Sequence, residues 1–392
     1  MTTPHRSPFG ARPAGWLALA LVLAAPAAVA HAQLAVSAND NKLVLVNGVA
    51  TVARNPAPDT VTIIDLNASP PRVVAEIPVP ASVVGPPQSV AITPDESLAL
   101  VTSAMKIDPA DPTKQIPDNR LSIIDLKASP PAVIGQVETG KGPAGLSINR
   151  QGTLGLVANR AEGTITVLGI KGKSVAVLDT VRLGDDKIGP SHVAITPDGT
   201  RALVTRDGDD RISVLSIADT KVEYTKRDVS AGLRPYGLDI SRDGAVAVVA
   251  NIGRGGGDSD TASLIDLRAR PPRVVDTVTV GQTPEGITLS PDGKLAAVVV
   301  MNGSNKARES PFFADSGKLV LLRVDGGRLT KVAEAPIGHW SQGAAFSADG
   351  QTLLVGNMVE KDIQVFRWDG SALRDTGQRI KVGGGSAALR TK

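Results

Sequence analysis

Six stretches of the chain repeat one pattern, and this repetition constrains the fold more than any other feature. Each copy is a short alternating strand, a polar turn with Asp-Gly or a near equivalent, and a second apolar strand, which together predict a β-hairpin. The copies are Val90–Ser103 "VAITPDESLALVTS", Leu146–Asn159 "LSINRQGTLGLVAN", Val193–Arg206 "VAITPDGTRALVTR", Leu238–Asn251 "LDISRDGAVAVVAN", Ile287–Val300 "ITLSPDGKLAAVVV" and Ala344–Asn357 "AAFSADGQTLLVGN". Most are preceded by Pro-x-Gly or a close variant, as in "RPYG" and "TPEG".

A second strand–turn–strand pattern follows each of these hairpins. It is clearest in "VTIIDLNASPPRVVAEI" at Val61–Ile77, and its Pro-Pro pair falls in the turn, where a missing N–H does not disturb a ladder. The other copies are Leu121–Val137, Ala262–Val278 and weaker versions that start at Ile165, Ile212, Leu319 and Ile363. The second pattern therefore occurs seven times and the first only six.

The missing half-unit is divided between the two ends of the chain. Asn41–Gly48 "NKLVLVNG" matches the second strand of a first hairpin, and "VGGGSAALRT" from Val382 matches the approach to its first strand. We therefore predict an all-β protein, a seven-bladed β-propeller of four-stranded blades with one blade shared between the N- and C-termini. Closing the ring in this way removes an open sheet edge. A β-sandwich or a solenoid is the alternative.

The N-terminal segment has the pattern of a secretory signal peptide. Arg6 and Arg12 precede an apolar run, Trp16–Ala25, of about ten residues, which is too short to span a bilayer. Small residues and A-x-A sites follow, so we expect a signal peptide over residues 1–32, cleaved near Ala32, and a single propeller over 33–392. The mature protein would be periplasmic or secreted, with no membrane span. An uncleaved membrane anchor is the alternative.

Composition excludes several classes of protein. The 392 residues include no cysteine, which rules out disulfides and thiolate-ligated cofactors. The formal net charge is +3 and no block of like charge runs along the chain, so a nucleic-acid partner is not expected.

The repeats resemble the YVTN/YncE-like family of bacterial seven-bladed propellers, which is related in fold to the lactonase-type propellers. The resemblance rests on "SPDG" and its variants, on second strands such as "LVAN" and on "IIDL" in the third strand, over nearly all of residues 33–392. The second strands lack the tyrosine of the family's name. The resemblance implies the fold, and the lactonase branch includes enzymes that hydrolyse sugar lactones.

In such a propeller the first strand of each blade lines a central channel. We expect the Pro-x-Gly approach and the end of the second strand to meet at one channel mouth, with the Asp-Gly turns on the opposite face. The predicted ligand- or partner-binding residues are Gln88, Arg160, His192, Arg206, Tyr236, Asn251, Glu285, Asn302, Phe312, Phe313, His339, Trp340, Gln342 and Asn357. Enlarged loops at Met105–Asn119, Ile252–Asp260 and Met301–Lys318 favour this face as a binding surface. The aromatic residues are suited to a binding hot spot, although they could equally anchor a loop or fill the channel.

Specific chemistry has weaker support. His192 or His339 with Glu285 or Asp207 could form an acid/base pair, and Arg206 or Arg160 could stabilise an oxyanion, which would suffice for lactone hydrolysis. No G-x-S-x-G or H-E-x-x-H motif is present. "DGDD" at Asp207–Asp210 and "GGGDSD" at Gly255–Asp260 lack the full ligand spacing of calcium loops and are expected to be solvated turns. No metal and no cofactor is predicted.

Our leading hypothesis is an exported binding module without catalysis, which recognises a small molecule or an envelope protein through its loop-rich face. We expect it to be a monomer. One alternative is a lactonase-like hydrolase with His192, Glu285, Arg206 and Asp207 as catalytic candidates. Another is an accessory propeller of a periplasmic dehydrogenase system.

Overall fold

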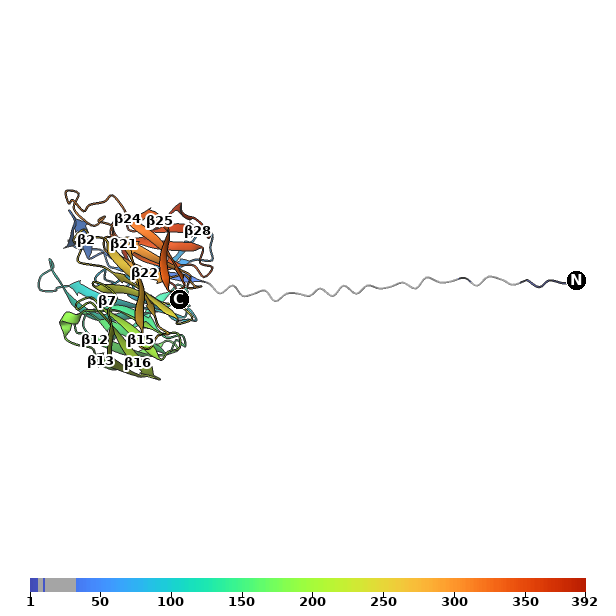
Figure 1. Ribbon diagram of the computed structural model, residues 1–392, viewed down its shortest axis with the longest axis horizontal. Coiled ribbons are helices and arrows are strands. Elements are labelled where there is room, and N and C mark those ends of the chain that lie inside the picture. Colours follow the sequence, from blue (N-terminus) through green and yellow to red (C-terminus); the bar gives the residue numbers. More distant parts are fainter. Residues whose placement is uncertain (6–9, 11–32) are drawn as a thin grey trace. The chain divides into compact units, whose positions relative to one another are not determined.

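The computed structural model describes residues 1–5, 10 and 33–392, so most of the predicted signal peptide lies outside the described residues. Residues 33–392 contain seven four-stranded antiparallel sheets and one separate hairpin (Figure 1). Each sheet is one blade. The helix in this part of the chain is a single 3-10 turn, η1 (Asp186–Ile188). No helix among the described residues has the length and apolar character needed to cross a membrane.

The blades follow one another along the chain. Blade 1 is β6 (Val90–Ile92), β7 (Leu98–Ile107), β8 (Gln115–Asp125) and β9 (Ala132–Glu138). Blade 2 is β10 (Pro143–Ile148), β11 (Leu154–Asn159), β12 (Thr164–Lys171) and β13 (Ser174–Arg182). Blade 3 is β14 (Pro190–Ile195), β15 (Arg201–Arg206), β16 (Arg211–Ala218) and β17 (Lys221–Val229). Blade 4 is β18 (Pro235–Ile240), β19 (Val246–Asn251), β20 (Asp260–Asp266) and β21 (Arg273–Gly281).

The remaining three blades complete the ring. Blade 5 is β22 (Pro284–Leu289), β23 (Leu295–Val300), β24 (Gly317–Asp325) and β25 (Arg328–Ile337). Blade 6 is β26 (Ser341–Phe346), β27 (Thr352–Asn357), β28 (Asp362–Trp368) and β29 (Leu373–Lys381). Blade 7 has the order β30 (Gly385–Arg390), β1 (Leu34–Asp40), β4 (Thr60–Asp65) and β5 (Arg72–Pro78). The first strand of each blade contacts that of the next, and β30 contacts β6, so the ring is closed.

Ring closure through a shared blade is confirmed, but the sequence assigned the wrong N-terminal strand. β30 pairs antiparallel with β1, with Val36 opposite Arg390. The predicted partner, Asn41–Gly48, instead contributes β2 (Leu43–Val46), which pairs only with β3 (Val49–Val52) in the separate hairpin. Both segments are short and apolar, but β1 is buried on both sides whereas β2 alternates between partly buried and exposed residues. Only the former pattern fits a strand between two packed blades.

Hydrophobic packing between blades explains why the sheets assemble. Seven core clusters occupy the seven junctions between neighbouring blades, including the junctions of blade 7 with blades 6 and 1. The second strand β11 is buried throughout, whereas the outer strand β13 is mostly exposed. Each blade therefore buries both faces only when it has a neighbour on each side. A further correction concerns Met105–Asn119, which is an extension of the β7–β8 ladder as far as Ile107 and Gln115 rather than an irregular loop.

A loop from blade 1 closes the central channel. Gln88 donates a hydrogen bond from Nε2 to the carbonyl of Leu238 at 2.7 Å and accepts one at Oε1 from the same residue's N–H at 3.1 Å. Leu146 N–H donates to the Gln88 carbonyl at 3.1 Å. Gln88 thus joins blades 2 and 4 across the channel and is only 2% exposed. Gln88 is one of the predicted ligand-binding residues, and the structure places it inside the channel, where we call it the Gln88 plug.

The glycine of the Pro-x-Gly approach is required by close packing around this plug. A Cβ on Gly286 would lie 2.5 Å from the carbonyl oxygen of Gln342 and 3.0 Å from Cγ of Pro87. A Cβ on Gly145 would lie 2.3 Å from Nδ1 of His192. Side chains at these positions would therefore push the inner strands apart.

We expect Gly286→Ala to lower the free energy of unfolding by about 1–3 kcal/mol, since the backbone of blade 6 must shift to admit the methyl group. Urea denaturation would measure the loss. The matched control is Gly135→Ala in the outer strand β9, where the nearest atom to a new Cβ is 3.7 Å away. Equal losses in the two variants would contradict the packing explanation.

Candidate active site at the channel mouth

Four charged or polar side chains meet where the chain enters blades 3 and 4. Arg160 and Asp207 form a two-point ion pair, with Nη2 of Arg160 2.8 Å from Oδ2 of Asp207. Arg234 donates to the same oxygen at 2.7 Å, and the Ser191 hydroxyl donates to Oδ1 at 2.7 Å. Two guanidinium groups therefore share one carboxylate, which leaves an excess positive charge in this cluster. Asp207 was expected in a solvated turn, but it is buried.

Arg234 is a site residue that the sequence analysis did not single out. It has φ of 55°, whereas the equivalent positions before Pro143 and Pro190 are Gly142 (φ 67°) and Gly189 (φ 57°). The left-handed conformation costs a non-glycine residue roughly 1 kcal/mol, so an arginine at this position is notable. Aligning the residues before the first strands would have revealed this charged residue at a position that is glycine in blades 2 and 3 and Thr283 or Trp340 in blades 5 and 6.

Tyr236 and Glu285 occupy equivalent positions on β18 and β22 and complete the group. The Arg160 guanidinium lies over the Tyr236 ring, 5.5 Å from its centre. Glu285 remains partly exposed and has no hydrogen-bond partner for its carboxylate among the described residues. We call Arg160, Asp207, Arg234, Tyr236 and Glu285 the polar sector of the mouth.

The two carboxyl groups of the polar sector have pKa values shifted in opposite directions. Burial raises the pKa of Glu285 to about 8, and the charges of Arg160 and Arg234 only partly oppose this. Burial also acts on Asp207, but hydrogen bonds from Arg160, Ser191 and Arg234 hold its pKa below the ordinary range. Two carboxyl groups in one site with divergent pKa values are typical of separate roles in acid–base chemistry. Asp207 is the fixed anion, and Glu285 can exchange a proton near neutral pH.

His192 does not join this group. It is 1% exposed, and its Nδ1 lacks a hydrogen-bond partner within the described part of the chain. Burial and the charge of Arg390 hold the pKa of His192 well below its usual range, so the ring stays neutral. Its place in the structure is inside the channel against Gly145, where it fills space.

Arg206, Asn251 and Asn357 point away from the mouth, contrary to prediction. Nδ2 of Asn251 donates to the hydroxyls of Thr261 and Ser263, at 3.0 and 2.9 Å, within its own blade. Arg206 makes the same kind of contact with Ser213 at 2.9 Å and also pairs with Asp209. Asn357 donates to Asp362 at 2.9 Å and accepts from Ser341 at 2.7 Å. In blades 3, 4 and 6 the last residue of the second strand therefore holds the third strand.

The other side of the mouth is covered by apolar residues. Trp340, predicted to be part of an exposed patch, is only 8% exposed and packs with Val83, Met301, Met358 and Ala387. We call these five residues the apolar cap. Leu43 and Leu45 of β2 pack against it, so the separate hairpin lies over this side. Gln342 is also buried and donates weakly to the Trp340 carbonyl at 3.4 Å.

The remaining predicted residues belong to the rim. Phe312 is 42% exposed and its ring lies against Gly257, while Phe313 is partly exposed and lies under Arg308. Asn302 donates to the Ser316 carbonyl at 3.2 Å and so holds its own loop. His339 pairs with Glu360 through Nδ1 at 2.6 Å. These four side chains are not brought into the polar sector.

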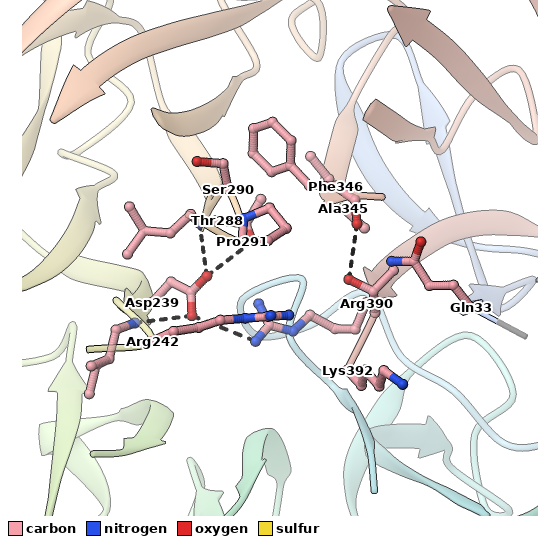
Figure 2. A pocket seen from close by; sticks show the side chains of 14 residues that line it. Gln33, Asp239, Arg242, Thr288, Ser290, Pro291, Ala345, Phe346, Arg390 and Lys392 are labelled. Atoms are coloured by element: carbon pink, nitrogen blue, oxygen red, sulfur yellow. Dashed lines mark hydrogen bonds and ion pairs between the residues drawn. The ribbon is translucent and has the colours of Figure 1, made fainter. Parts of the chain in front are cut away.

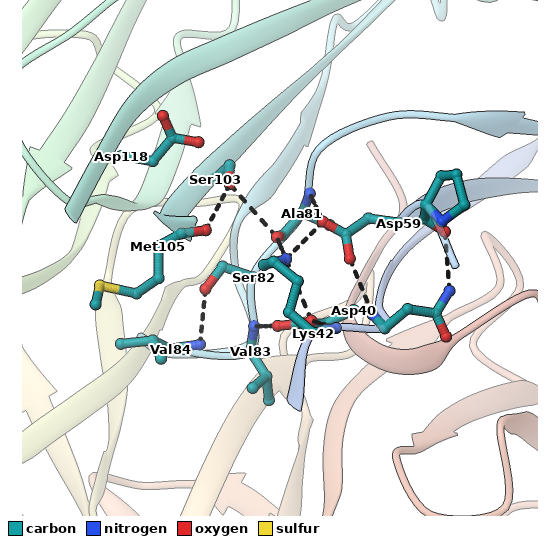
Figure 3. Close-up of polar contacts among 12 residues, drawn as sticks. Asp40, Lys42, Asp59, Ala81, Ser82, Val83, Val84, Ser103, Met105 and Asp118 are labelled. Atoms are coloured by element: carbon teal, nitrogen blue, oxygen red, sulfur yellow. Dashed lines mark hydrogen bonds and ion pairs between the residues drawn. The ribbon is translucent and has the colours of Figure 1, made fainter. Parts of the chain in front are cut away.

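A second buried ion cluster supports the blade 1 loop and was not predicted (Figure 3). Lys42 lies 3.2 Å from Asp40 and 2.5 Å from Asp59, and Asp40 also accepts the Val83 N–H at 2.8 Å. Lys42 donates in addition to the Ala81 carbonyl. The cluster therefore fixes the segment that leads into the Gln88 plug. Burial, together with the charge of Asp59, raises the pKa of Asp40 despite Lys42.

We expect Lys42→Met to lower the free energy of unfolding by about 2 kcal/mol at pH 7, because it leaves two facing carboxylates without a cation. The pKa of Asp40 is raised, so this carboxylate is neutralised as the pH falls, and the loss should be smaller near pH 4. Urea denaturation at both pH values would measure this. Lys106→Met is the control, since Lys106 is 40% exposed and 3.9 Å from Asp118. A loss that does not depend on pH would contradict the ionic explanation.

Within residues 1–5, 10 and 33–392 there is no group of three or more His, Asp or Glu side chains arranged to hold a metal ion. The site as described consists of protein groups: one carboxyl that can titrate, two guanidinium groups, a tyrosine and an apolar wall.

The family model of "Lactonase, 7-bladed beta-propeller" matches residues 113–389, which is more than half of the chain. The chain belongs to this lactonase family. The YVTN/YncE resemblance is thereby supported only at the level of the lactonase-type seven-bladed propeller. No curated protein matches the chain in sequence.

Solved structures agree with the lactonase-family fold. The structure of "a putative 6-phosphogluconolactonase" from Bacteroides fragilis is 20% identical, with a TM-score of 0.70, over 93% of this chain and 99% of that one. The periplasmic gluconolactonase of Pseudomonas aeruginosa is 20% identical, with a TM-score of 0.62, over 91% and 99%. Hydrazine synthase of Kuenenia stuttgartiensis is 18% identical, with a TM-score of 0.62, over 80% and 91%. At these identities the likeness shows the shared fold alone.

Proposed function

We propose that the protein hydrolyses a sugar lactone at the polar sector of the channel mouth. The observation that carries the proposal is Glu285, a carboxyl with a pKa of about 8 and no hydrogen-bond partner in the described structure, beside Arg160 and Arg234. Membership of the lactonase family supports it, as do the names of two structural relatives, a putative 6-phosphogluconolactonase and a periplasmic gluconolactonase. The binding-module hypothesis made from the sequence is therefore replaced as the leading proposal.

The residues suggest a simple sequence of steps. Ionised Glu285 removes a proton from a water molecule as that water attacks the lactone carbonyl. Arg234 is the more exposed of the two arginines and contacts Asp207 through one nitrogen, whereas Arg160 is held by Asp207 at two points; Arg234 therefore stabilises the oxyanion of the tetrahedral intermediate. When the intermediate collapses, Glu285 returns the proton to the ring oxygen that leaves. One water is consumed, the ester bond breaks, and a hydroxy acid is released.

The apolar cap gives this site a second wall. Trp340 and the two methionines of the cap lie across the mouth from charged groups, and an apolar wall beside a few polar groups is typical of a small-molecule site. A sugar ring has an apolar face that such a wall can contact.

The direct test is hydrolysis by purified protein of glucono-δ-lactone, galactono-γ-lactone, a phosphorylated sugar lactone and an N-acyl homoserine lactone, followed with a pH indicator. We expect saturable rates above the buffer background for at least one sugar lactone and none for the acyl homoserine lactone. Rates equal to the background for every sugar lactone would reject the proposal.

A non-catalytic binding role is the second candidate. Val46, Val49 and Phe312 are exposed, and Gly48 of the β2–β3 hairpin packs against Ala307 in the loop that carries Phe312. An apolar rim of this kind is suited to a partner protein. This role would be favoured if the protein hydrolysed every lactone at the background rate and bound a partner protein whose binding is lost in Phe312→Ser.

A further inference from the structure

A cavity of about 190 Å³ lies at the opposite end of the channel from the polar sector. It is formed where the inner strands β18, β22, β26 and β30 end, beside the Asp-Gly turns. Asp239, Arg242, Thr288, Arg390 and Lys392 are among the residues that line it (Figure 2). The Gln88 plug lies between this cavity and the polar sector, so the two are separate sites. The sequence analysis singled out none of these residues.

The carboxylate of Asp239 is already used by neutral donors. Oδ2 accepts from the Thr288 hydroxyl at 3.0 Å and from the Leu289 N–H at 2.9 Å, and Oδ1 accepts from the Ile240 N–H at 3.0 Å. Arg390 is 3.8 Å from Oδ1, which is an ion pair without a hydrogen bond. Asp239 therefore joins blades 4 and 5 and leaves the Arg390 donors largely unsatisfied.

Two arginine side chains, Arg242 and Arg390, line the cavity together with this carboxylate. Figure 2 shows the side chains of Arg242 and Arg390 extending toward one another below Asp239. Arg242 has no hydrogen-bond or ion-pair partner for its side chain among the described residues, and the Arg390 side chain is 24% exposed. A guanidinium group binds a carboxylate or a phosphate through two parallel hydrogen bonds. Because Asp239 is already bonded to neutral donors, the two arginines remain able to bind an added anion.

We propose that this cavity is a second site, which binds a small anion bearing a carboxylate or phosphate group between Arg242 and Arg390. The volume corresponds to roughly six water molecules, which admits a small acid and not a polymer segment. Hydroxyls of a sugar acid would meet Lys392 and the carbonyl groups at the strand ends. The site does not depend on whether the polar sector hydrolyses lactones.

Calorimetric titration of the purified protein tests this proposal with three probes: sodium gluconate, inorganic phosphate and neutral glucose. We expect saturable binding of gluconate, phosphate or both, none for glucose, and weaker binding at higher salt. Gluconate alone would identify an organic-acid site, and phosphate alone would identify a phosphate site. Either result supports the proposal.

Substitution of the two arginines tests whether the anion binds in this cavity. Arg242→Gln and Arg390→Gln should each weaken binding about tenfold or more, the loss expected for one charge-assisted contact. Arg323→Gln, on an exposed part of β24, changes the charge equally and should have no effect. Because Arg390 lies in the closing strand, its variant needs a circular dichroism check, whereas Arg242 is exposed in a turn. No saturable binding in the tens of millimolar, or binding that is unchanged in Arg242→Gln and lost in Arg160→Gln, would overturn the proposal.

Discussion

Glu285→Gln is expected to slow lactone hydrolysis by about 10²–10⁴-fold, because the amide cannot accept the proton of the attacking water. The variant keeps the size of the side chain, so substrate binding should change little and the loss should appear in kcat. The wild-type rate, after subtraction of the alkaline background, should rise with pH through a midpoint near 8 as Glu285 ionises. Initial rates between pH 6 and 9.5 would measure both effects.

Although it slows the reaction, the same substitution should raise the free energy of unfolding at alkaline pH. Glu285 has a folded pKa of about 8, well above its ordinary value of 4.5, so the wild-type protein loses stability as the pH rises between these values. Glutamine does not ionise. Glu285→Gln should therefore be more stable than the wild type at pH 9, on the order of 2 kcal/mol given the carboxyl's contact with water, and equal to it near pH 4. A variant that stays active, or that is destabilised at pH 9, would show that Glu285 has another role.

Asp207→Asn is expected to lower the free energy of unfolding by about 3 kcal/mol, since it leaves Arg160 and Arg234 facing one another without their shared anion. The pKa of Asp207 is depressed, so its contribution is present at neutral pH and lost as the pH falls through the folded pKa. The difference between the variant and the wild type should therefore shrink at a pH below the ordinary pKa of an aspartate.

This variant also tests whether the polar sector acts as one unit. The charge of Asp207 raises the pKa of Glu285, so its removal should move the midpoint of the pH–rate profile below 8. Asp243→Asn, at an exposed ion pair with Arg268, is the matched control and should change neither property. An unshifted midpoint in Asp207→Asn would mean that Glu285 does not control the rate.

Much of the candidate site was within reach of sequence reasoning. The repeats identify the approach to each first strand and the end of each second strand, and these segments supply Arg160, Asp207, Tyr236 and Glu285. The same reasoning also included Arg206, Asn251 and Asn357, which are one residue away and point into their own blades. A step of one residue along a strand reverses the direction of a side chain, so an error of one position exchanges a site residue for a structural one.

The sequence by itself determined the all-β class, the number of blades, the ring closure by the two termini and the face on which the chain approaches each inner strand. These features follow from local sequence patterns that recur in each blade, so a pattern that is unclear in one repeat can be recognised by comparison with the others. Only the tertiary structure decided which side chains meet. Gln88 is 150 residues from Leu238 and 199 residues from Ile287, and no local pattern specifies these contacts. Ring closure creates these contacts, and with them the plug, the buried mouth and the pKa of Glu285.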